Sequence, residues 1–321
     1  MGGGAASVVV SSWRETGRVR CIRGVTVRIA ILGPLAATHH GQPVVPTAVK
    51  PRTVLGVLAV NANDVVPVDV LISELWPDSP PRHARTTIQT YVLGLRKLMQ
   101  GAAAAVDKPD DSKQVLVTTP AGYLLRVPRD SVDAGHFERL ANIGYRARER
   151  QEHAAAARAF AEALSWWRGP ALVDVQAGRR LRLYAQRLSE GRLNALSCRI
   201  EADVRLGRHH ELIGELSVVT SQHPTHEGLV AHLMLALYRS GRRCEALETY
   251  QRLRANLTDQ RGLEPSPALR RLHRSMLSAD QATTDLVEPW QGTQGAPHRP
   301  APQQRIPADV ATMPWSVGGP N

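Results

Sequence analysis

The spacing of hydrophobic positions changes along the chain and separates two regions of different structure. From residue 25 to 127, short β-branched runs alternate with apolar stripes at helical spacing, a pattern that predicts strands around a few helices. From 133 to 280 the apolar residues recur at helical spacing almost throughout, with breaks at glycine and proline. We therefore expect a mainly α protein with a small β component, in which an all-α domain follows the first region.

The elements of the first region come in the order of a winged helix. Prolines mark the start of two apolar helices, and a turn at Pro120-Ala121-Gly122 separates two short, mainly apolar runs, as in a β-hairpin. Strands, three helices and a hairpin predict a winged helix-turn-helix domain over residues 25–127. The expected elements are strands at 25–32 and 43–45, helices near 51–58, 68–76 and 82–99, and a hairpin at 115–127.

The second region contains an internal repeat. Gly207 and Gly241, each followed by arginine, lie 34 residues apart, and apolar positions after them match at the same offset. This is the tetratricopeptide period, so we expect pairs of helices with these glycines in the turns. The alternative is a chance recurrence of Gly-Arg turns in an arginine-rich helical protein. The matched pairs are Leu212 with Ala246, Leu216 with Tyr250 and Val219 with Leu253, and a weaker copy fits Ala156, Phe160 and Ala163.

The two ends of the chain lack a pattern that would bury a core. Residues 1–24 show no periodicity and are expected to form a disordered extension. Residues 281–321 combine seven prolines with glutamine and glycine, a composition typical of a flexible tail. The domain prediction is therefore a winged helix at 25–127 and a helical, tetratricopeptide-like domain at 133–280, between two disordered tails.

Composition narrows the class of protein without naming its partner. The net charge of +11 favours a polyanionic partner, but the basic surplus is spread along the chain and does not specify one. The longest apolar runs are too short to cross a bilayer, and the three cysteines form no CxxC pair. We expect a cytoplasmic protein with no membrane partner.

The helix predicted at 82–99 carries the main candidates for reading DNA. Its apolar positions, Ala84, Ile88, Tyr91, Val92, Leu95 and Leu98, define an inward stripe, and no acidic residue occurs between Arg82 and Gln100. Arginine, glutamine and threonine on the opposite face can pair with base edges in the major groove. An ordinary solvated helix face is the alternative, and the hairpin that follows favours the DNA-binding interpretation.

The remaining candidates surround this helix. Arg96 and Lys97 suit phosphate contacts two turns further along, Lys50 and Arg52 can hold a phosphate at a helix N-terminus, and the hairpin tip can enter the minor groove. The candidate DNA-binding residues are Lys50, Arg52, Arg82, Arg85, Thr86, Gln89, Thr90, Leu93, Arg96, Lys97, Thr119, Gly122 and Tyr123.

Several stretches resemble the Streptomyces antibiotic regulatory protein family, in which an OmpR-type winged helix precedes a bacterial transcriptional activation domain. The resemblance runs from about residue 27 to 279 in order. The matching stretches are 31–35, 68–76, 88–92 and 120–125 in the first region, and 133–140, 167–172, 235–242 and 262–265 in the second.

The resemblance implies an activator of a secondary-metabolite (antibiotic) gene cluster. Such a protein binds double-stranded DNA at direct repeats in promoters, recruits RNA polymerase, acts as a homo-oligomer on DNA and is associated with the nucleoid. The chain departs from the family at Leu93-Gly94, where polar or basic residues are usual. This departure indicates a different target sequence.

Other functional classes find less support in the sequence. The pairs His209-His210 and His223 with His226 lack nearby cysteines or clustered carboxylates, so no metal is expected there. Motifs of hydrolases, metalloproteases and nucleotide-binding enzymes are missing, so we expect no enzyme and no cofactor. Trp166-Trp167 are expected in the core. A helical-repeat scaffold for proteins and a ligand-sensing regulator remain as alternatives.

Overall fold

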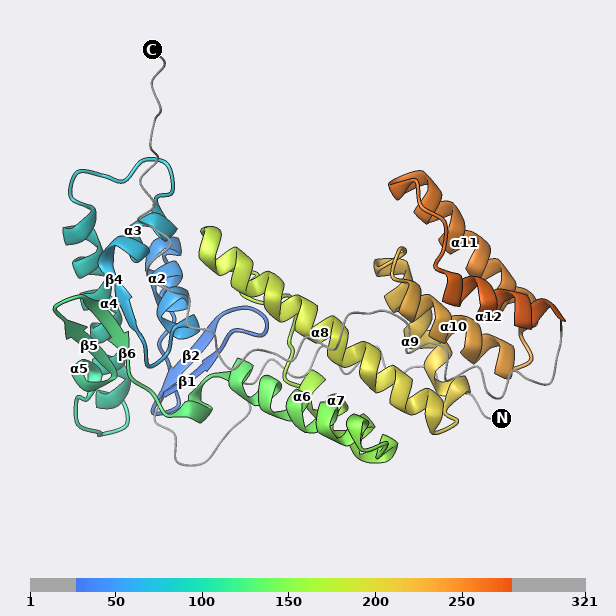
Figure 1. Ribbon diagram of the computed structural model, residues 1–321. Coiled ribbons are helices and arrows are strands. Elements are labelled where there is room, and N and C mark those ends of the chain that lie inside the picture. The colour runs from blue at the N-terminus through green and yellow to red at the C-terminus, as the bar shows by residue number, and fades with distance from the viewer. Residues whose placement is uncertain (1–26, 279–321) are drawn as a thin grey trace, which may run out of the picture. The chain divides into compact units, whose positions relative to one another are not determined.

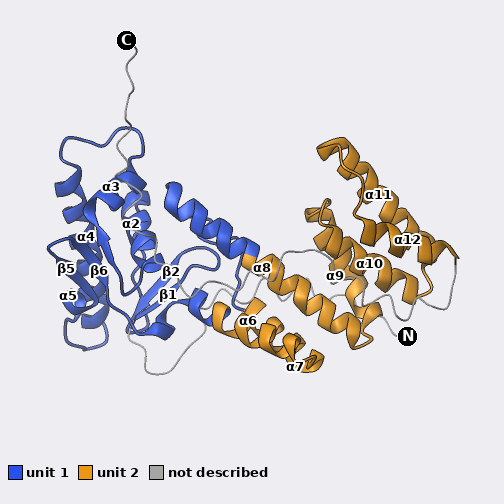
Figure 2. Ribbon diagram, viewed as in Figure 1, with its two compact units in different colours: residues 1–137, 166–190, 300–321 blue, residues 138–165, 191–299 orange. Residues whose placement is uncertain are grey.

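The computed structural model describes residues 27–278, and the predicted disordered tails, 1–24 and 281–321, lie outside them. The described chain is mostly helical with two small antiparallel sheets (Figure 1), as the hydrophobic pattern predicts. It forms two compact units (Figure 2). Unit 1 contains residues 27–137 and 166–190, and unit 2 contains 138–165 and 191–278. The units interleave along the sequence, a feature that the hydrophobic pattern does not reveal.

Unit 1 begins with a three-stranded antiparallel sheet. Its strands are β1 (Val27–Ala30), β2 (Ala36–His39) and β3 (Gln42–Pro43), in the order β1-β2-β3. His40 and Gly41 connect β2 to β3 with positive φ angles of 49° and 83°, as a type I′ hairpin turn requires. Strand β1 confirms the strand predicted at 25–32, whereas β2 was not predicted.

The next elements of unit 1 form the expected winged helix-turn-helix. Three helices pack on one another, and the third is followed by the hairpin of the wing. The wing belongs to a second antiparallel sheet of order β4-β6-β5, in which β4 precedes the second of these helices. The elements are α2 (Val49–Val60), β4 (Val65–Pro67), α3 (Val68–Leu75), α4 (Ala84–Ala104), α5 (Ser112–Val115), β5 (Leu116–Thr119) and β6 (Gly122–Leu125).

Residues 166–178, the connection between α7 (His153–Leu164) and α8 (Arg179–Arg205), return to the first sheet. The backbone N–H of Arg168 donates to the carbonyl of Leu32 at 2.7 Å, and that of Leu172 donates to Ile31 at 3.1 Å. Trp167 is buried with its ring edge-on to Phe137, which confirms the prediction of a core residue there. Trp166 is half-buried and stacks on His136.

Two buried carboxylates fix where the long helices of the second region begin. Asp133, the first residue of α6 (Asp133–Glu149), accepts hydrogen bonds from the backbone N–H groups of Ile31 at 2.8 Å and Leu32 at 3.1 Å. Glu74 of α3 accepts from the N–H groups of Arg180 at 2.6 Å and Leu181 at 3.3 Å. Glu74 therefore caps the N-terminus of α8, where the helix dipole favours a negative charge.

Unit 2 consists of helices joined by repeated tight turns. Gln151, Gly207 and Gly241 have positive φ angles of 60°, 81° and 78°. In each turn the N–H of the following residue bonds to a carbonyl five residues earlier, which closes the preceding helix in a Schellman motif. The elements of this unit are most of α6, α7, the second half of α8, α9 (His209–Gln222), α10 (Glu227–Arg239), α11 (Arg243–Arg261) and α12 (Pro267–Ser278).

The three turns reveal three equivalent helices. Residues five, nine and twelve positions after each turn residue are buried in α7, α9 and α11. They are Ala156, Phe160 and Ala163; Leu212, Leu216 and Val219; and Ala246, Tyr250 and Leu253. The predicted repeat is confirmed, including its weaker copy. That copy departs from the 34-residue period because residues 166–190 pack in unit 1 before the chain returns to unit 2.

None of the helices within residues 27–278 is both long and apolar enough to cross a membrane.

The close approach of β6 to β4 at Gly122 should make the stability of the fold sensitive to any side chain at this position. A Cβ added there would lie 2.0 Å from the carbonyl oxygen of Val66, whereas a Cβ added at Gly94 meets nothing within 4 Å. Gly122→Ala should lower the free energy of unfolding by about 3 kcal/mol, because the strands must separate. Gly94→Ala should raise it by about 0.5–1 kcal/mol. Urea unfolding measures both, and equal effects of the two changes would contradict this account.

The buried carboxyl group of Asp133 should make the free energy of unfolding depend on pH. Burial raises its pKa to about 6 from an ordinary value of 3.8, although three backbone N–H groups and the Arg168 guanidinium favour the charged form. Between about pH 4 and 6 the folded protein therefore binds more protons here than the unfolded chain. The contribution of Asp133 to stability is full below this window and falls as the pH rises through it.

Urea unfolding of the wild type and Asp133→Asn from pH 4 to 7 measures this contribution. The free energy of unfolding of the wild type, relative to the variant, should fall by on the order of 3 kcal/mol with rising pH. A constant difference across this range would show that the pKa of the carboxyl group is not shifted in the folded protein, a rising difference would show that it is lowered, and either result would contradict this account.

Candidate nucleic-acid interface

Helix α4 is held in unit 1 by an apolar stripe. Ile88, Val92 and Leu95 are almost fully buried, and α4 packs against α2 and α3. The predicted stripe is wrong at its C-terminal end, where Leu98 is 40% exposed and Met99 is buried instead. The helix continues to Ala104, and residues 99, 102 and 103 carry the buried stripe onward.

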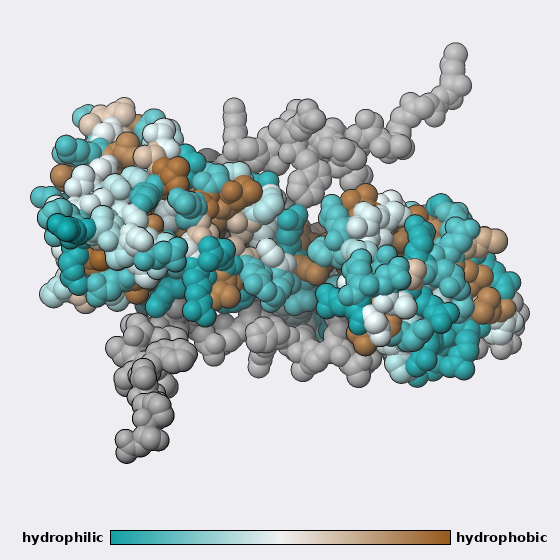
Figure 3. All heavy atoms as spheres, turned by 90° about the horizontal axis from the view of Figure 1, so that it is seen from above, coloured by the Kyte–Doolittle hydropathy of each residue, from teal (hydrophilic) through white to brown (hydrophobic). Residues whose placement is uncertain are grey.

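The opposite face of α4 is exposed and carries no acidic side chain. This face brings together most of the predicted reading residues, and it includes Leu93, which is 52% exposed. Figure 3 shows the setting more broadly, with hydrophilic residues over much of the visible surface of the described chain and hydrophobic residues in smaller groups. The exposed candidates on and just before α4 are Arg82, Arg85, Thr86, Gln89, Thr90, Leu93 and Lys97.

Side chains on this face differ in how firmly they are held. Arg85 donates to Asp69 of α3 at 2.7 Å, but both side chains are more than two-thirds exposed, so water screens the pair and it contributes at most about 1 kcal/mol. The hydroxyl of Thr90 donates to the carbonyl of Thr86 and keeps its lone pairs for a further donor. The amide of Gln89 has no hydrogen-bond partner within residues 27–278.

Arg96 makes contacts within unit 1 that were not predicted. Its Nε and Nη2 donate to the carbonyl of Leu116 at 3.0 and 2.6 Å, and Nη2 also donates to the hydroxyl of Thr118 at 2.8 Å. Both acceptors belong to β5, so the guanidinium connects α4 to the wing. The phosphate contact expected of Arg96 stays a prediction, and the structure adds a second role, because Nε and Nη2 hold the hairpin in position.

Two wing candidates lie inside unit 1. Tyr123 is only 6% exposed, and the backbone of Gly122 is buried against β4. Their burial gives both residues a structural role in the wing, and their contact with DNA stays a prediction. Thr119 is half-buried, and its hydroxyl both donates to the carbonyl and accepts from the N–H of Gly122. The exposed tip of the wing consists of Pro120 and Ala121.

The two basic candidates near the start of α2 are also occupied within unit 1. Lys50 lies over the ring of Trp76, with Nζ 4.3 Å from the ring centroid. Arg52 donates to the carbonyl of Pro46 at 3.1 Å and to the carboxylate of Asp174 at 3.2 Å. These contacts connect α2 to its neighbours in unit 1, and a phosphate contact of either residue stays a prediction. The pairing of Asp69 with Arg85, and that of Thr118 with Arg96, were not predicted because they are tertiary contacts.

Comparison with known proteins places both regions in one family. The model of the bacterial transcriptional activator domain matches residues 132–277. The chain is 48% identical to the regulatory protein DnrI of Streptomyces peucetius over 79% of this chain and 93% of that protein. It is 34% identical to the transcriptional regulator RedD of Streptomyces coelicolor over 80% of this chain and 72% of that protein.

A solved structure supports the same assignment. Mycobacterium tuberculosis EmbR, in complex with a low-affinity phosphopeptide, matches with a TM-score of 0.73 and 35% identity, over 82% of this chain and 68% of that chain. The relatives named above are regulators, and the fold of the described chain resembles that of EmbR. The chain therefore belongs to the Streptomyces antibiotic regulatory protein family of DNA-binding transcriptional activators.

Proposed function

We propose that the chain recognises promoter DNA by placing the exposed face of α4 in the major groove. The observation that carries this proposal is the acid-free face itself, with a glutamine amide that no internal partner occupies and an arginine held only by an exposed ion pair. A major groove admits one α-helix, and glutamine and arginine pair with adenine and guanine edges. Arg85 and Gln89 are therefore assigned to base reading.

The neighbouring residues complete the assignment. Thr86 and Thr90 offer hydroxyl oxygens beside Gln89, and the exposed side chain of Leu93 suits the methyl group of a thymine. Arg82 and Lys97, near the two ends of the exposed face, are placed at phosphates, where contacts position the helix without specifying sequence. Arg96 orients the wing, and Thr119 shapes its tip.

The proposed partners follow from the family. We infer that protomers bind direct repeats in promoters of a secondary-metabolite gene cluster, as a homo-oligomer on nucleoid DNA, and that they recruit RNA polymerase. Direct repeats suit a head-to-tail arrangement, in which each protomer places its own α4 in a successive groove. The helical repeat of unit 2, with its exposed polar faces, is assigned to contacts with polymerase and the neighbouring protomer.

The alternative is a helical-repeat scaffold whose winged helix contacts proteins. An electrophoretic shift with DNA from the chain's own upstream promoter distinguishes the two. Salt-sensitive binding is expected for the DNA reader, because phosphate contacts release counterions. Salt-sensitive binding that is equal for the promoter and for scrambled DNA would contradict sequence-specific recognition, and the absence of any binding would favour the scaffold.

Removing the glutamine amide should change base preference more than general affinity. Gln89→Ala should cost about 1–3 kcal/mol at a single base position and leave binding to unrelated DNA unchanged. Arg85→Ala should do the same at a neighbouring base. Fluorescence anisotropy with a set of single-base operator variants measures both losses, with Leu98→Ala as a control outside the proposed reading set. An unchanged base preference in Gln89→Ala would overturn the assignment of the reading face.

Alanine variants of the adjacent residues Arg96 and Lys97 distinguish a side chain that positions the wing from one that contacts a phosphate. Arg96→Ala should lower the free energy of unfolding by about 1–3 kcal/mol, because it removes the donors to Leu116 and Thr118. Lys97→Ala should change stability by less than about 0.5 kcal/mol, weaken binding to all sequences alike and reduce the salt slope by about 0.9. Unfolding curves and salt titrations test the pair, and equal stability of the two variants would contradict the role of Arg96.

A further inference from the structure

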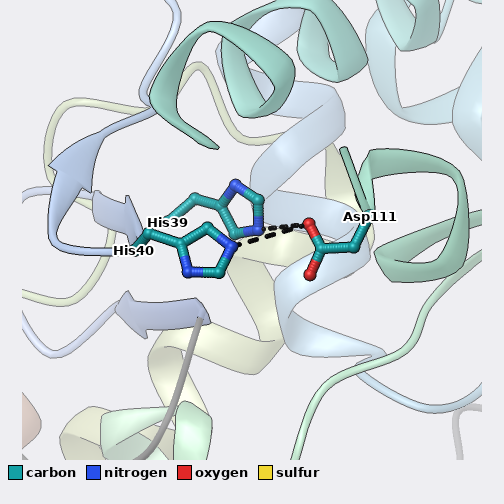
Figure 4. Close-up of side chains that lie close together, drawn as sticks. All are labelled: His39, His40 and Asp111. Carbon is teal, nitrogen blue, oxygen red and sulfur yellow. Dashed lines mark ion pairs between the residues drawn. The ribbon is translucent and has the colours of Figure 1, made fainter. Parts of the chain in front are cut away.

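Two histidines and an aspartate converge at one end of the first sheet of unit 1. Nε2 of His39 lies 2.9 Å and Nε2 of His40 lies 3.8 Å from the same carboxylate oxygen, Oδ1 of Asp111. Figure 4 shows both rings directed at this oxygen. All three atoms lie within 4.8 Å of one another, and within residues 27–278 no other group of histidine, cysteine and acidic side chains is gathered in this way.

The hairpin turn explains how consecutive residues can point to the same place. Neighbours in a regular strand project to opposite faces of the sheet. His40 leaves the strand with φ of 49° in the type I′ turn, and its ring comes within 4.3 Å of the His39 ring, centroid to centroid. A left-handed conformation costs a residue with a side chain roughly 1–2 kcal/mol, and glycine or asparagine would avoid most of this cost.

Hydrogen bonding fixes which nitrogen of His39 carries the hydrogen when the ring is neutral. Nδ1 lies 3.0 Å from the carbonyl oxygen of Met99, and because a carbonyl only accepts, Nδ1 carries the hydrogen. In the neutral ring, Nε2 then directs a lone pair at the carboxylate oxygen. His39 is 0% exposed, and within the described residues neither its Nε2 nor Oδ1 of Asp111 has a hydrogen-bond partner. Two buried lone pairs at this distance repel one another unless a proton or a metal cation lies between them.

We propose that His39, His40 and Asp111 bind a divalent transition-metal ion of the zinc type. Imidazole nitrogen and carboxylate oxygen are ligands that Zn²⁺ prefers, at distances of about 2.0–2.2 Å. Tetrahedral ligands at that distance lie about 3.3–3.6 Å from one another, between the two separations observed here. The carbonyl of Met99 orients the His39 ring, as outer partners of metal-bound histidines do. A fourth position remains for water.

An ion at this site would link two segments of unit 1 that lie beside the proposed reading helix and the wing. Met99 belongs to α4, the proposed reading helix, and Asp111 immediately precedes α5 and the first strand of the wing. A bound ion would connect the β2–β3 turn to the segment between the reading helix and the wing. Because such an ion binds the folded chain in preference to the unfolded one, it should raise the unfolding temperature. This inference does not depend on the proposed DNA contacts.

Zinc titration of the full chain tests the site. The chain is stripped with a chelator, desalted and titrated with Zn²⁺ alone by calorimetry, and its thermal unfolding is followed with and without Zn²⁺. We expect one ion per chain and a higher unfolding temperature. His40→Asn is the informative variant, because asparagine tolerates the left-handed turn while it removes one imidazole. It should weaken binding by roughly tenfold or more.

Matched controls separate this site from adventitious ligands. The double variant His209→Asn and His210→Asn removes another adjacent histidine pair, and Cys244→Ser removes an exposed thiol. Both should bind Zn²⁺ as the wild type does. The proposal is overturned if the wild type takes up no ion, if His40→Asn binds as tightly as the wild type, or if a control variant loses the binding. In those cases His39 and Asp111 form an ordinary buried ion pair.

Discussion

The structure depends on the burial of polar groups where two distant segments rejoin the first sheet. Asp133 satisfies the backbone N–H groups of Ile31 and Leu32, and the carbonyls of the same two residues accept from residues 172 and 168. A buried carboxylate or an open strand end is costly unless it is hydrogen-bonded, so each of these groups needs the others. The hydrogen bonds of Asp133 fix where α6 begins, and those of Glu74 fix where α8 begins.

Hydrophobic periodicity predicts those helices and strands that are long enough for the pattern to repeat. The three helices of the winged domain, the hairpin and the repeated turns of unit 2 follow from apolar spacing, proline and glycine. Strands β2 and β4 and helix α5 span only three or four residues and leave almost no pattern. The return of residues 166–190 to unit 1 was not predictable, because its hydrogen bonds join residues more than a hundred positions apart.

The same difference between local periodicity and tertiary contacts explains which residues of the candidate site could be predicted. The exposed face of α4 is set by helical geometry, so most of its residues could be predicted from spacing alone. Arg96 and Tyr123 could not be assigned in this way, because a partner in β5 and burial in the wing are properties of the tertiary structure. The convergence of His39, His40 and Asp111 likewise requires a left-handed turn and a contact between distant segments. The only local sign was a histidine before Gly41 at a hairpin turn.

The central claim is that the exposed face of α4 meets the bases, and photo-crosslinking tests it most directly. In a chain whose native cysteines are replaced by serine, Gln89→Cys is coupled to a photo-crosslinker and bound to promoter DNA. The matched control is Val173→Cys, another exposed position of unit 1. The account predicts cross-links from position 89 to bases within the operator and none from position 173. Cross-links from position 173 but not from position 89 would contradict it.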